Sequence, residues 1–271
     1  MVTGSRGGTS LRAIMSKLVI EQIPVLTDNY VYLAHDPDSG ATAVIDPALA
    51  PPVLEKLQAK GWRLTHILNT HHHDDHVGGN LALKQATGAL VVGNRKDAAR
   101  IPGIDVEVAD GDSFLLGAAA AMVMEVSGHT IGHIAFWFPA SHALFSGDTL
   151  FAMGCGRLFE GTGQQMWNSL HKIRSLPDET LVYCAHEYTE ANARFARTVE
   201  RHNPELLERI EEVKQTRRHH RPTVPMSLGI ERRTNPFLRA DVESVKAGVG
   251  LPPDADPAQV FTEIRRRKDV F

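Results

Sequence analysis

One seven-residue segment, residues 70–76, limits the folds available to this chain more than any other feature. It reads Thr-His-His-His-Asp-Asp-His, with four histidines and two aspartates. Imidazole nitrogens and carboxylate oxygens are the ligands that zinc, iron and manganese accept in proteins. An apolar run precedes the segment at residues 64–68, and Gly78 and Gly79 follow it. The segment is therefore expected to lie between a strand and a helix, where α/β proteins place their chemistry.

The spacing within this segment is His-x-His-x-Asp-His. It supplies two pairs of ligand-type residues, His71 with His73 and Asp75 with His76. Two pairs are enough to begin two neighbouring metal sites. The alternative is a solvated histidine-rich loop, as in a purification tag. That alternative is disfavoured because the run is internal, contains aspartates and is framed by regular elements.

Composition excludes several classes of protein. The 271 residues suffice for one large or two modest domains, and 42% hydrophobic with 23% charged residues is typical of a soluble globular chain. The net charge of -3 provides no basic field for nucleic acid or a membrane surface. Apolar runs are far shorter than the ~20 residues that span a bilayer. The two cysteines, Cys155 and Cys184, form no CxxC motif. They favour a reducing compartment, so we expect a cytoplasmic protein.

The pattern of predicted elements changes near Tyr188. Short β-type runs fill residues 18–183, with helices expected at 52–61, 80–87 and 164–175. Helix formers and charges then dominate. Helices are expected at 189–202, 204–220 and 257–269, and a long connection at 221–236. Residues 1–14 lack the apolar core of a secretory signal and are expected to be a disordered extension. The predicted organisation is this extension, a β-rich catalytic domain at 15–187 and a helical domain at 188–271.

Three further ligand-type residues follow β-type runs. His129 comes after residues 122–126, Asp148 after residues 143–145, and His186 after residues 181–183. A glycine before His129 and before Asp148 allows a tight turn at the strand end. Each residue alone is equally well explained as a capping or core polar group. Their repeated position at strand ends predicts that they converge on one rim with the first segment.

The order His-x-His-x-Asp-His, His129, Asp148 and His186 resembles the metallo-β-lactamase superfamily. Within it, the chain is similar to the hydroxyacylglutathione hydrolases, the glyoxalase II family, from about residue 16 to residue 271. Further matching motifs are Asp46-Pro47, Gly154-Cys155-Gly156-Arg157, His186-Glu187-Tyr188-Thr189, Thr234-Asn235-Pro236-Phe237 and Arg265-Arg266-Arg267-Lys268-Asp269. The resemblance implies an α/β (α+β) fold, a metallo-β-lactamase αββα sandwich followed by an all-helical C-terminal domain that binds glutathione.

The resemblance also implies two metal ions, zinc being expected and iron or manganese being alternatives. The implied ligands are His71, His73 and His129 for one ion, Asp75, His76 and His186 for the other, and Asp148 as the bridge. His72 and Asp74 occupy variable positions and are not expected to be ligands. Asp46 would orient a ligand histidine. His133 is expected to be structural, and Cys155 to be a small buried thiol.

The implied reaction is hydrolysis of the thioester S-D-lactoylglutathione to glutathione and D-lactate, the second step of methylglyoxal detoxification. A hydroxide between two ions about 3.5–4 Å apart would attack the thioester carbonyl, with Asp75 and Asp148 as the catalytic carboxylates. A Gly-x-Ser-x-Gly elbow, which would indicate a serine nucleophile, does not occur in the sequence.

Glutathione carries two carboxylates and requires cationic and polar partners. The residues that the resemblance assigns to it are Arg157, Phe159, Tyr188, Asn192, Arg265 and Lys268. Phe159 stands where the family often has tyrosine and cannot donate a hydrogen bond, and Arg157 replaces a common lysine. Without the resemblance, the terminal basic run would be interpreted as a solvated helix face or a nucleic-acid patch.

Two other functions remain open. One is a mononuclear-iron persulfide dioxygenase of the same superfamily, and the other is a non-enzymatic module stabilised by a metal. Asp75 and the cationic helical tail favour the hydrolase. Structural zinc sites are typically closed, rich in cysteine and mononuclear, unlike this set. We expect a monomer that acts on a small-molecule thioester, with no nucleic-acid or membrane partner.

Overall fold

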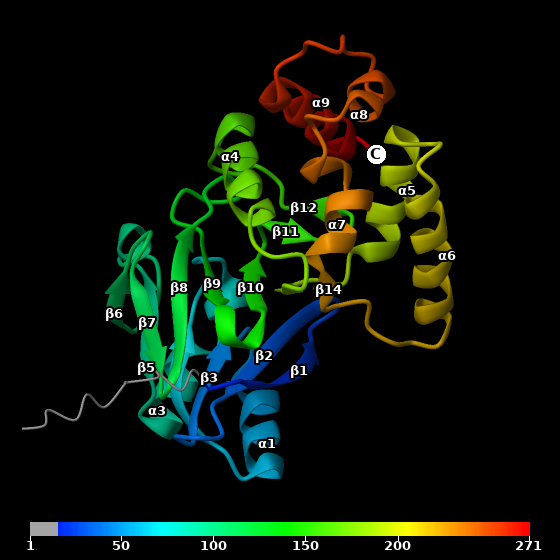
Figure 1. Ribbon diagram of the computed structural model, residues 1–271. Helices are drawn as coiled ribbons and strands as arrows, with labels where there is room; N and C mark the ends of the chain where they lie inside the picture. Colours follow the sequence, from blue (N-terminus) through cyan, green and yellow to red (C-terminus); the bar gives the residue numbers. More distant parts are fainter. Residues whose placement is uncertain (1–15) are drawn as a thin grey trace, which may run out of the picture.

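Two six-stranded sheets face each other and enclose the larger hydrophobic core. The computed structural model describes residues 16–271 (Figure 1), so the extension expected at residues 1–14 lies outside the described part. The strand order is β1-β2-β3-β4-β5-β6 in the first sheet and β14-β13-β10-β9-β8-β7 in the second. The ring centroids of Tyr32, from the first sheet, and Phe145, from the second, are 5.8 Å apart. The core therefore lies between the sheets.

The first sheet is antiparallel at one edge and parallel over the rest. Its strands are β1 (Val19–Val25), β2 (Asn29–His35), β3 (Ala41–Ile45), β4 (Arg63–Leu68), β5 (Leu90–Asn94) and β6 (Ile104–Val108). In β2, Tyr30 and Tyr32 belong to the core between the sheets, and Val31 and Leu33 belong to a second cluster on the outer face. This alternation follows from the two-residue period of a strand. Both faces of β2 are therefore covered.

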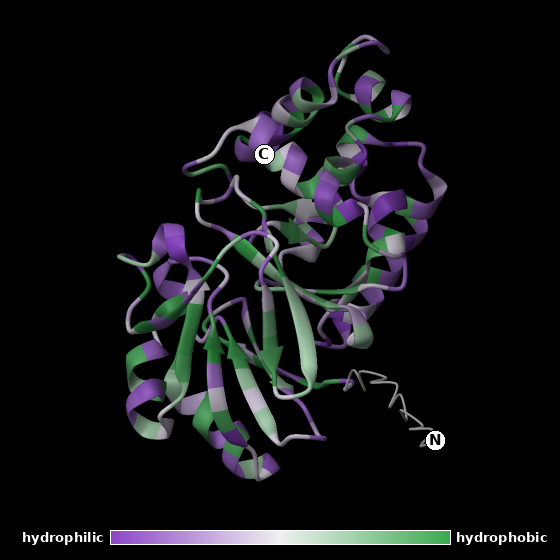
Figure 2. Cartoon of the chain, turned by 60° about the vertical axis from the view of Figure 1, so that its left-hand side comes forward, coloured by the Kyte–Doolittle hydropathy of each residue, from purple (hydrophilic) through white to green (hydrophobic). Residues whose placement is uncertain are grey.

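Two helices cover the outer face of the first sheet. These are α1 (Ala50–Lys60) and α3 (Asn80–Thr87), which contribute Val53, Leu57 and Leu83 to the outer cluster. Gly61 and Gly88 end these helices in the left-handed conformation, which glycine adopts at little cost. The short helix α2 (Asp74–Val77) lies between β4 and α3. Figure 2 shows hydrophobic residues prevailing in the strands and hydrophilic residues recurring along the helices.

The second sheet is antiparallel except where β10 pairs with β13. Its strands are β7 (Ser113–Leu116), β8 (Ala119–Glu125), β9 (Ile134–Phe138), β10 (Ala143–Gly147), β13 (Leu181–Cys184) and β14 (Met226–Ser227). A small separate sheet joins β11 (Leu150–Phe151) to β12 (Gly154–Cys155). Helix α4 (Gly163–Arg174) begins at a capping box formed by Thr162 and Gln165 and buries Met166 and Leu170 in the core.

The C-terminal part is mainly helical and packs beside β11 and β12 at one end of the sandwich (Figure 1). Its helices are α5 (Thr189–Val199), α6 (Pro204–Arg218), α7 (Leu228–Thr234), α8 (Glu243–Gly248) and α9 (Pro257–Asp269). The 3-10 helices of the described chain are η1 (Arg95–Asp97), η2 (Pro139–Ser141) and η3 (Pro236–Leu238). Helix α9 contacts α4, so the end of the chain returns to the sandwich.

The predicted elements and the structure agree except where contacts are non-local. Helices predicted at 80–87 and 257–269 have the same bounds as α3 and α9. The prediction of a long connection at 221–236 was wrong, because this stretch contains β14 and α7. Strand β14 has two residues and exists through its pairing with Leu181 and Val182. A pairing partner more than forty residues away leaves no local periodicity in the sequence. The region predicted to be helical, residues 188–271, therefore also contains the short strand β14.

The buried carboxylate of Glu231 joins α7 to α6 and to the β11–β12 turn. It accepts hydrogen bonds from the backbone N–H of Met153 at 2.9 Å and from Asn235 Nδ2 at 2.9 Å. It also forms an ion pair with Arg209, itself almost fully buried. Thr234 accepts a second hydrogen bond from the same guanidinium at 2.5 Å. Glu231 thus satisfies donors from three segments.

Replacing Glu231 by alanine is expected to destabilise the protein strongly. It leaves the Arg209 charge and the Met153 N–H buried without their partner, and breaking a buried pair in this way costs about 3–5 kcal/mol. The measurement is the free energy of unfolding from urea denaturation. Glu211→Ala, which removes an exposed carboxylate on α6, serves as control and should change stability by no more than about 0.5 kcal/mol. Equal stabilities would contradict the role of Glu231.

Candidate metal centre and the adjoining pocket

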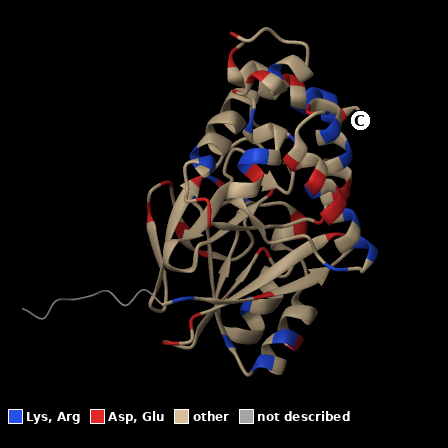
Figure 3. Cartoon of the chain, turned by 45° about the vertical axis from the view of Figure 1, so that its right-hand side comes forward, with Lys and Arg blue, Asp and Glu red and all other residues tan. Residues whose placement is uncertain are grey.

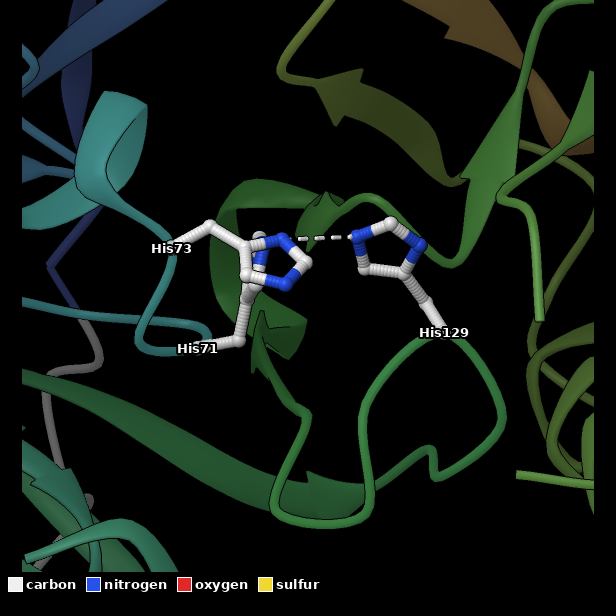
Figure 4. A group of neighbouring side chains, drawn as sticks. All are labelled: His71, His73 and His129. Carbon is white, nitrogen blue, oxygen red and sulfur yellow. Dashed lines mark hydrogen bonds between the residues drawn. The ribbon is translucent and has the colours of Figure 1, made fainter. Parts of the chain in front are cut away.

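The ends of β4, β8, β10 and β13 deliver the histidines and aspartates to one place. The segment between β4 and α2 carries His71 and His73, and the loop between β8 and β9 carries His129. Figure 4 shows these three side chains pointing toward one another from two loops. Asp148 follows β10, and His186 follows β13. Residues separated by more than one hundred positions in the sequence thus share one centre.

The first cluster consists of His71, His73 and His129. The Nδ1 atom of His73 lies 3.0 Å from Nε2 of His71 and 3.1 Å from Nε2 of His129. Around a tetrahedral ion with bonds of about 2.0–2.1 Å, ligand atoms are about 3.3 Å apart. The three nitrogens are therefore spaced as the corners of a metal site.

The second cluster consists of Asp75, His76 and His186. The Oδ2 atom of Asp75 lies 3.5 Å from Nε2 of His76 and 3.5 Å from Nε2 of His186. Both histidines are buried, and the Asp75 side chain is 39% exposed. Water is therefore excluded from the two histidines of this cluster but reaches its carboxylate.

Asp148 lies between the two clusters. Its Oδ2 atom is 3.4 Å from Nε2 of His129, and its Oδ1 atom is 3.3 Å from Nε2 of His186 and 3.6 Å from Nε2 of His76. Within residues 16–271, Nε2 of His76 and Oδ1 of Asp148 are buried without a hydrogen-bond partner. Buried polar atoms nearly always have a partner. A cation on each side of Asp148 would satisfy both atoms, so the donor set fits two metal ions.

The pKa values of the two clusters differ in direction. Burial and the neighbouring imidazoles hold the pKa of His71 well below its usual range, and burial also lowers the pKa of His73 and of His129. Neutral imidazole is the form that binds metals. For His76, burial is outweighed by the carboxylates of Asp148 and Asp46, and the pKa rises to about 9. The half of the centre around His76 therefore has an excess of negative charge.

Asp46, at the end of β3, supports both clusters. Its carboxylate accepts hydrogen bonds from the Thr70 backbone N–H at 2.8 Å and from the Thr70 hydroxyl at 2.6 Å, and it lies 3.1 Å from Nδ1 of His76. Because the Thr70 hydroxyl donates to Asp46, its oxygen is free to accept from Nδ1 of His71, 3.1 Å away. Asp46 thus orients His76 directly and His71 through Thr70.

Four residues that the sequence analysis kept out of the ligand set have other contacts or are exposed. His72 lies 3.3 Å from Asp97 and 3.1 Å from Arg100, and Asp74 is exposed. His133 accepts a hydrogen bond from the backbone N–H of Asp148 at 3.1 Å through Nε2. Cys155 is buried, and burial raises its pKa to about 12.

A cavity of about 790 Å³ adjoins the centre, with His129 and Asp148 in its wall. Further lining residues are the six assigned to substrate binding from the sequence, namely Arg157, Phe159, Tyr188, Asn192, Arg265 and Lys268. Helices α5 and α9 provide three of the six, and Tyr188 directly precedes α5. Figure 3 shows Lys and Arg residues on the helices near the C-terminus. The cavity therefore joins the metal centre to a positively charged wall.

Some lining residues are held rigidly by the protein. Arg265 is buried, donates to the Cys155 carbonyl at 3.0 Å and pairs with Asp269 at 2.8 Å. Asn192 Nδ2 donates to the Ala152 carbonyl at 3.1 Å. Tyr188 stacks on His186, with ring centroids 4.8 Å apart and an interplanar angle of 1°. These residues form a fixed wall.

Other lining residues are exposed or half-buried, and among them Lys268 donates to the Ala191 carbonyl at 3.2 Å. Arg157 and Arg194 are exposed, and within residues 16–271 neither side chain has an ion-pair partner. Lys268 is half-buried, and burial together with Arg265, Arg194 and Arg157 lowers its pKa to about 8. Phe159 is 62% exposed, and its ring lies 5.1 Å from that of His129. Phe159 therefore offers an apolar surface beside the centre.

Sequence reasoning missed three residues here. Arg194 lines the cavity one helical turn beyond Ala191, which also lines it, and no feature of the sequence distinguished Arg194 from the other arginines of this helix. Asp28 and Asn29 contact the second cluster through Nδ1 of His186 and Oδ2 of Asp75. Their sequence signal was an Asp-Asn pair, which by itself indicates only a turn.

The fold and the histidine and aspartate clusters define a member of the metallo-β-lactamase superfamily, whose family model matches residues 25–186. A second model, described as the hydroxyacylglutathione hydrolase C-terminus, matches residues 187–271. A hydroxyacylglutathione hydrolase from Methylococcus capsulatus is 62% identical over 254 residues, covering 94% of this chain and 99% of the relative. One from Rhodospirillum rubrum is 54% identical over 257 residues, covering 95% and 100%. The chain therefore belongs to the hydroxyacylglutathione hydrolase family.

Solved structures agree with this fold. The crystal structure of ETHE1 from Myxococcus xanthus has a TM-score of 0.66 and 26% identity, covering 92% of this chain and 90% of that one. The structure of TTHA1623 in a di-iron-bound form has a TM-score of 0.59 and 26% identity, covering 81% and 99%. The predicted family and fold class are confirmed. Within residues 16–271, no helix is both long enough and apolar enough to cross a membrane.

Proposed function

We propose that this chain hydrolyses the thioester S-D-lactoylglutathione to glutathione and D-lactate. The observation that carries the proposal is the continuity of the cavity, whose wall contains His129 and Asp148 at one side and the cations Arg157, Arg194 and Lys268 at the other. A substrate with an anionic peptide part and a reactive acyl part matches both sides. The family relatives named hydroxyacylglutathione hydrolase support the same activity.

The proposed centre holds two metal ions, zinc being expected and iron or manganese being alternatives. The proposed ligands are His71, His73 and His129 for the first ion, Asp75, His76 and His186 for the second, and Asp148 for both. The two clusters and the unpartnered atoms of His76 and Asp148 support this assignment. When bound, two such ions bring the pKa of a water molecule near neutrality and polarise a carbonyl group.

The protein groups fix the geometry and the substrate. The carboxylates of Asp75 and Asp148 lie beside Nε2 of His76, and Asp46 orients this ring from the Nδ1 side. Arg157, Arg194 and Lys268 would bind the carboxylates of glutathione as charge-assisted hydrogen-bond donors. Phe159 would cover the acyl side as an apolar wall. Specificity is thus expected to come from the α5 and α9 side of the cavity.

The alternative functions are less well supported. A mononuclear site would use one cluster and leave the three ligand-type residues of the other without a metal. A structural metal site would not adjoin a cavity of about 790 Å³ lined by the cations Arg157, Arg194 and Lys268. We further propose the division into 15–187 and 188–271, and a cytoplasmic monomer that requires neither nucleic acid nor a membrane. The two free, buried cysteines are compatible with a reducing compartment.

Replacing Asp148 by alanine is expected to remove both metal binding and activity. It takes away the ligand atom that faces each cluster, so the purified variant should hold fewer than the two ions of the parent. The measurements are metal content by elemental analysis and kcat/KM for S-D-lactoylglutathione. Asp74→Ala removes an exposed carboxylate from the same segment and should retain two ions. A fully active Asp148→Ala protein would refute the two-metal centre.

S-D-lactoylglutathione is expected to be hydrolysed far faster than the D-lactoyl thioester of N-acetylcysteamine, which lacks both carboxylates.

Arg194→Ala should raise KM for the glutathione thioester by up to about tenfold. This is the low end of the range for a charged hydrogen bond, because the side chain is exposed. The value of kcat should stay constant, because contacts far from the scissile bond act equally on ground and transition states.

The matched control for Arg194 is Arg197→Ala, an exposed arginine on the same helix that does not line the cavity. It should leave KM at the parent value. Equal kcat/KM for the two thioesters in the parent protein would remove the case for a glutathione site. An unchanged KM in Arg194→Ala would exclude only that residue.

KM for S-D-lactoylglutathione is expected to rise as pH increases through about 8. Lys268, with its pKa lowered to about 8, is charged below that pH and neutral above it, and only the charged form attracts a carboxylate. Lys268→Arg keeps its charge throughout, so its KM should vary less over pH 7–9.5. The N-acetylcysteamine thioester reports ionisations elsewhere in the protein. Identical KM profiles for parent and Lys268→Arg would contradict this assignment.

A further inference from the structure

The turn between β1 and β2 places two consecutive side chains against the second cluster. Oδ1 of Asp28 lies 2.9 Å from Nδ1 of His186, and Asn29 Nδ2 donates to Oδ2 of Asp75 at 2.9 Å. His186 and Asp75 are 158 and 46 positions away from their partners in the sequence. One tight turn thus contacts two members of the cluster that come from different elements.

Backbone hydrogen bonds fix this turn on both sides of His186. The Tyr30 N–H donates to the Ala185 carbonyl at 2.7 Å, and the Glu187 N–H donates to the Asp28 carbonyl at 2.9 Å. The Tyr30 hydroxyl also donates to the Glu187 carboxylate at 2.8 Å. The position of Asp28 relative to His186 is therefore set by the backbone and does not depend on a flexible side chain.

The two contacts determine how the cluster presents its ligand atoms. When Nδ1–H of His186 donates to Asp28, the lone pair of His186 is on Nε2, which faces Asp148 at 3.3 Å and Asp75 at 3.5 Å. The Asp75 side chain is 39% exposed and would otherwise rotate. The amide of Asn29 holds its Oδ2 atom toward the two histidines. Asp28 thus favours the tautomer of His186 that carries its proton on Nδ1, and Asn29 favours the rotamer of Asp75 that faces the two histidines.

In the first cluster, the outward ring nitrogens of His129 and His71 face neutral groups. Nδ1 of His129 lies 2.9 Å from the backbone carbonyl of Arg157, and Nδ1 of His71 faces the neutral Thr70 hydroxyl. In the second cluster, both histidines face carboxylates, His76 that of Asp46 and His186 that of Asp28. The side-chain contact of Asp28 is therefore with the second cluster and not with the first.

We propose that Asp28 and Asn29 are positioning residues that set the metal affinity of the second cluster selectively. The inference rests on the ligand assignment made under the proposed function, and it does not depend on the identity of the substrate. Removing the hydrogen-bond partner of a metal-binding histidine typically costs ten- to a hundredfold in metal affinity. Asp28→Ala should therefore weaken one of two zinc ions by about that factor and leave the other at the parent affinity.

Conservative variants separate positioning from simple packing. Asp28→Asn keeps an oxygen that accepts from Nδ1 of His186 but loses the charge, so its second zinc affinity should lie between parent and Asp28→Ala. Asn29→Asp is nearly isosteric but puts a negative charge beside Asp75 and removes its donor. It should weaken the second ion at least as much as Asn29→Ala. A residue needed only to fill space would tolerate both conservative changes.

The experiment is a chelator competition on the zinc-loaded, full-length protein without substrate, which resolves the two dissociation constants. Asp74→Asn, which removes an exposed charge from the same centre, is the control and should match the parent. Thermal melting of the metal-free variants checks the fold, and each should melt within a few degrees of the metal-free parent. If Asp28→Ala and Asn29→Asp hold both ions as tightly as the parent, the proposal is overturned.

His186→Ala distinguishes this failure from failure of the ligand assignment. If it loses one ion selectively, the second site exists as assigned, and the Asp28 and Asn29 results stand on their own. If it keeps two ions at parent affinity, the ligand assignment falls, and the positioning proposal falls with it. Equal weakening of both ions in Asp28→Ala would overturn the claim of selectivity while leaving the assignment intact.

Discussion

Burial of ionisable groups around Asp148 is the constraint on which the rest of this structure depends. His71, His76, His129, His186 and Asp148 lie together with little access to water. Water would otherwise solvate their polar atoms, so each atom needs a partner supplied by the protein or by an ion. The outward nitrogens are satisfied by protein groups. The inward atoms of His76 and Asp148 have no such partner within residues 16–271, which makes the centre a site for cations.

In the sandwich, the residues whose polar atoms face the centre and the residues that orient them come from different segments. Parallel and antiparallel strands end at one edge, and their following residues supply the inward atoms, while the β1–β2 turn and the end of β3 supply the outward partners. Strands buried on both sides, such as β2, fix these positions through packing. The helical part then adds Arg194, Arg265 and Lys268 to the cavity wall, to which the sandwich contributes Arg157. The two clusters therefore come from the sandwich, whereas the cavity wall combines residues of the sandwich and of the helical part.

Much of this arrangement could be predicted from the sequence because its signals are local. The spacing of His71, His73, Asp75 and His76 lies within one segment, helix α3 ends at Gly88, and helix α9 begins after the cap Asp256. The contacts of Asp28 and Asn29 could not be predicted, since their partners are distant and an Asp-Asn pair indicates a turn equally well without them. Strand β14 was missed for the same reason, because two residues carry no period. Arg265 was predicted as a substrate contact. Its burial against Cys155 and Asp269 shows that it also fixes the position of the cavity wall.

The order of the elements along the chain has a consequence for biosynthesis. The residues of both clusters precede α5, whereas the cavity wall requires α9, which is made last and packs back on α4. A nascent chain thus completes both clusters before α9, which carries Arg265 and Lys268, has left the ribosome. Completion of the two clusters therefore precedes completion of the cavity wall, and a chain interrupted before α9 would retain the clusters but lack Arg265 and Lys268.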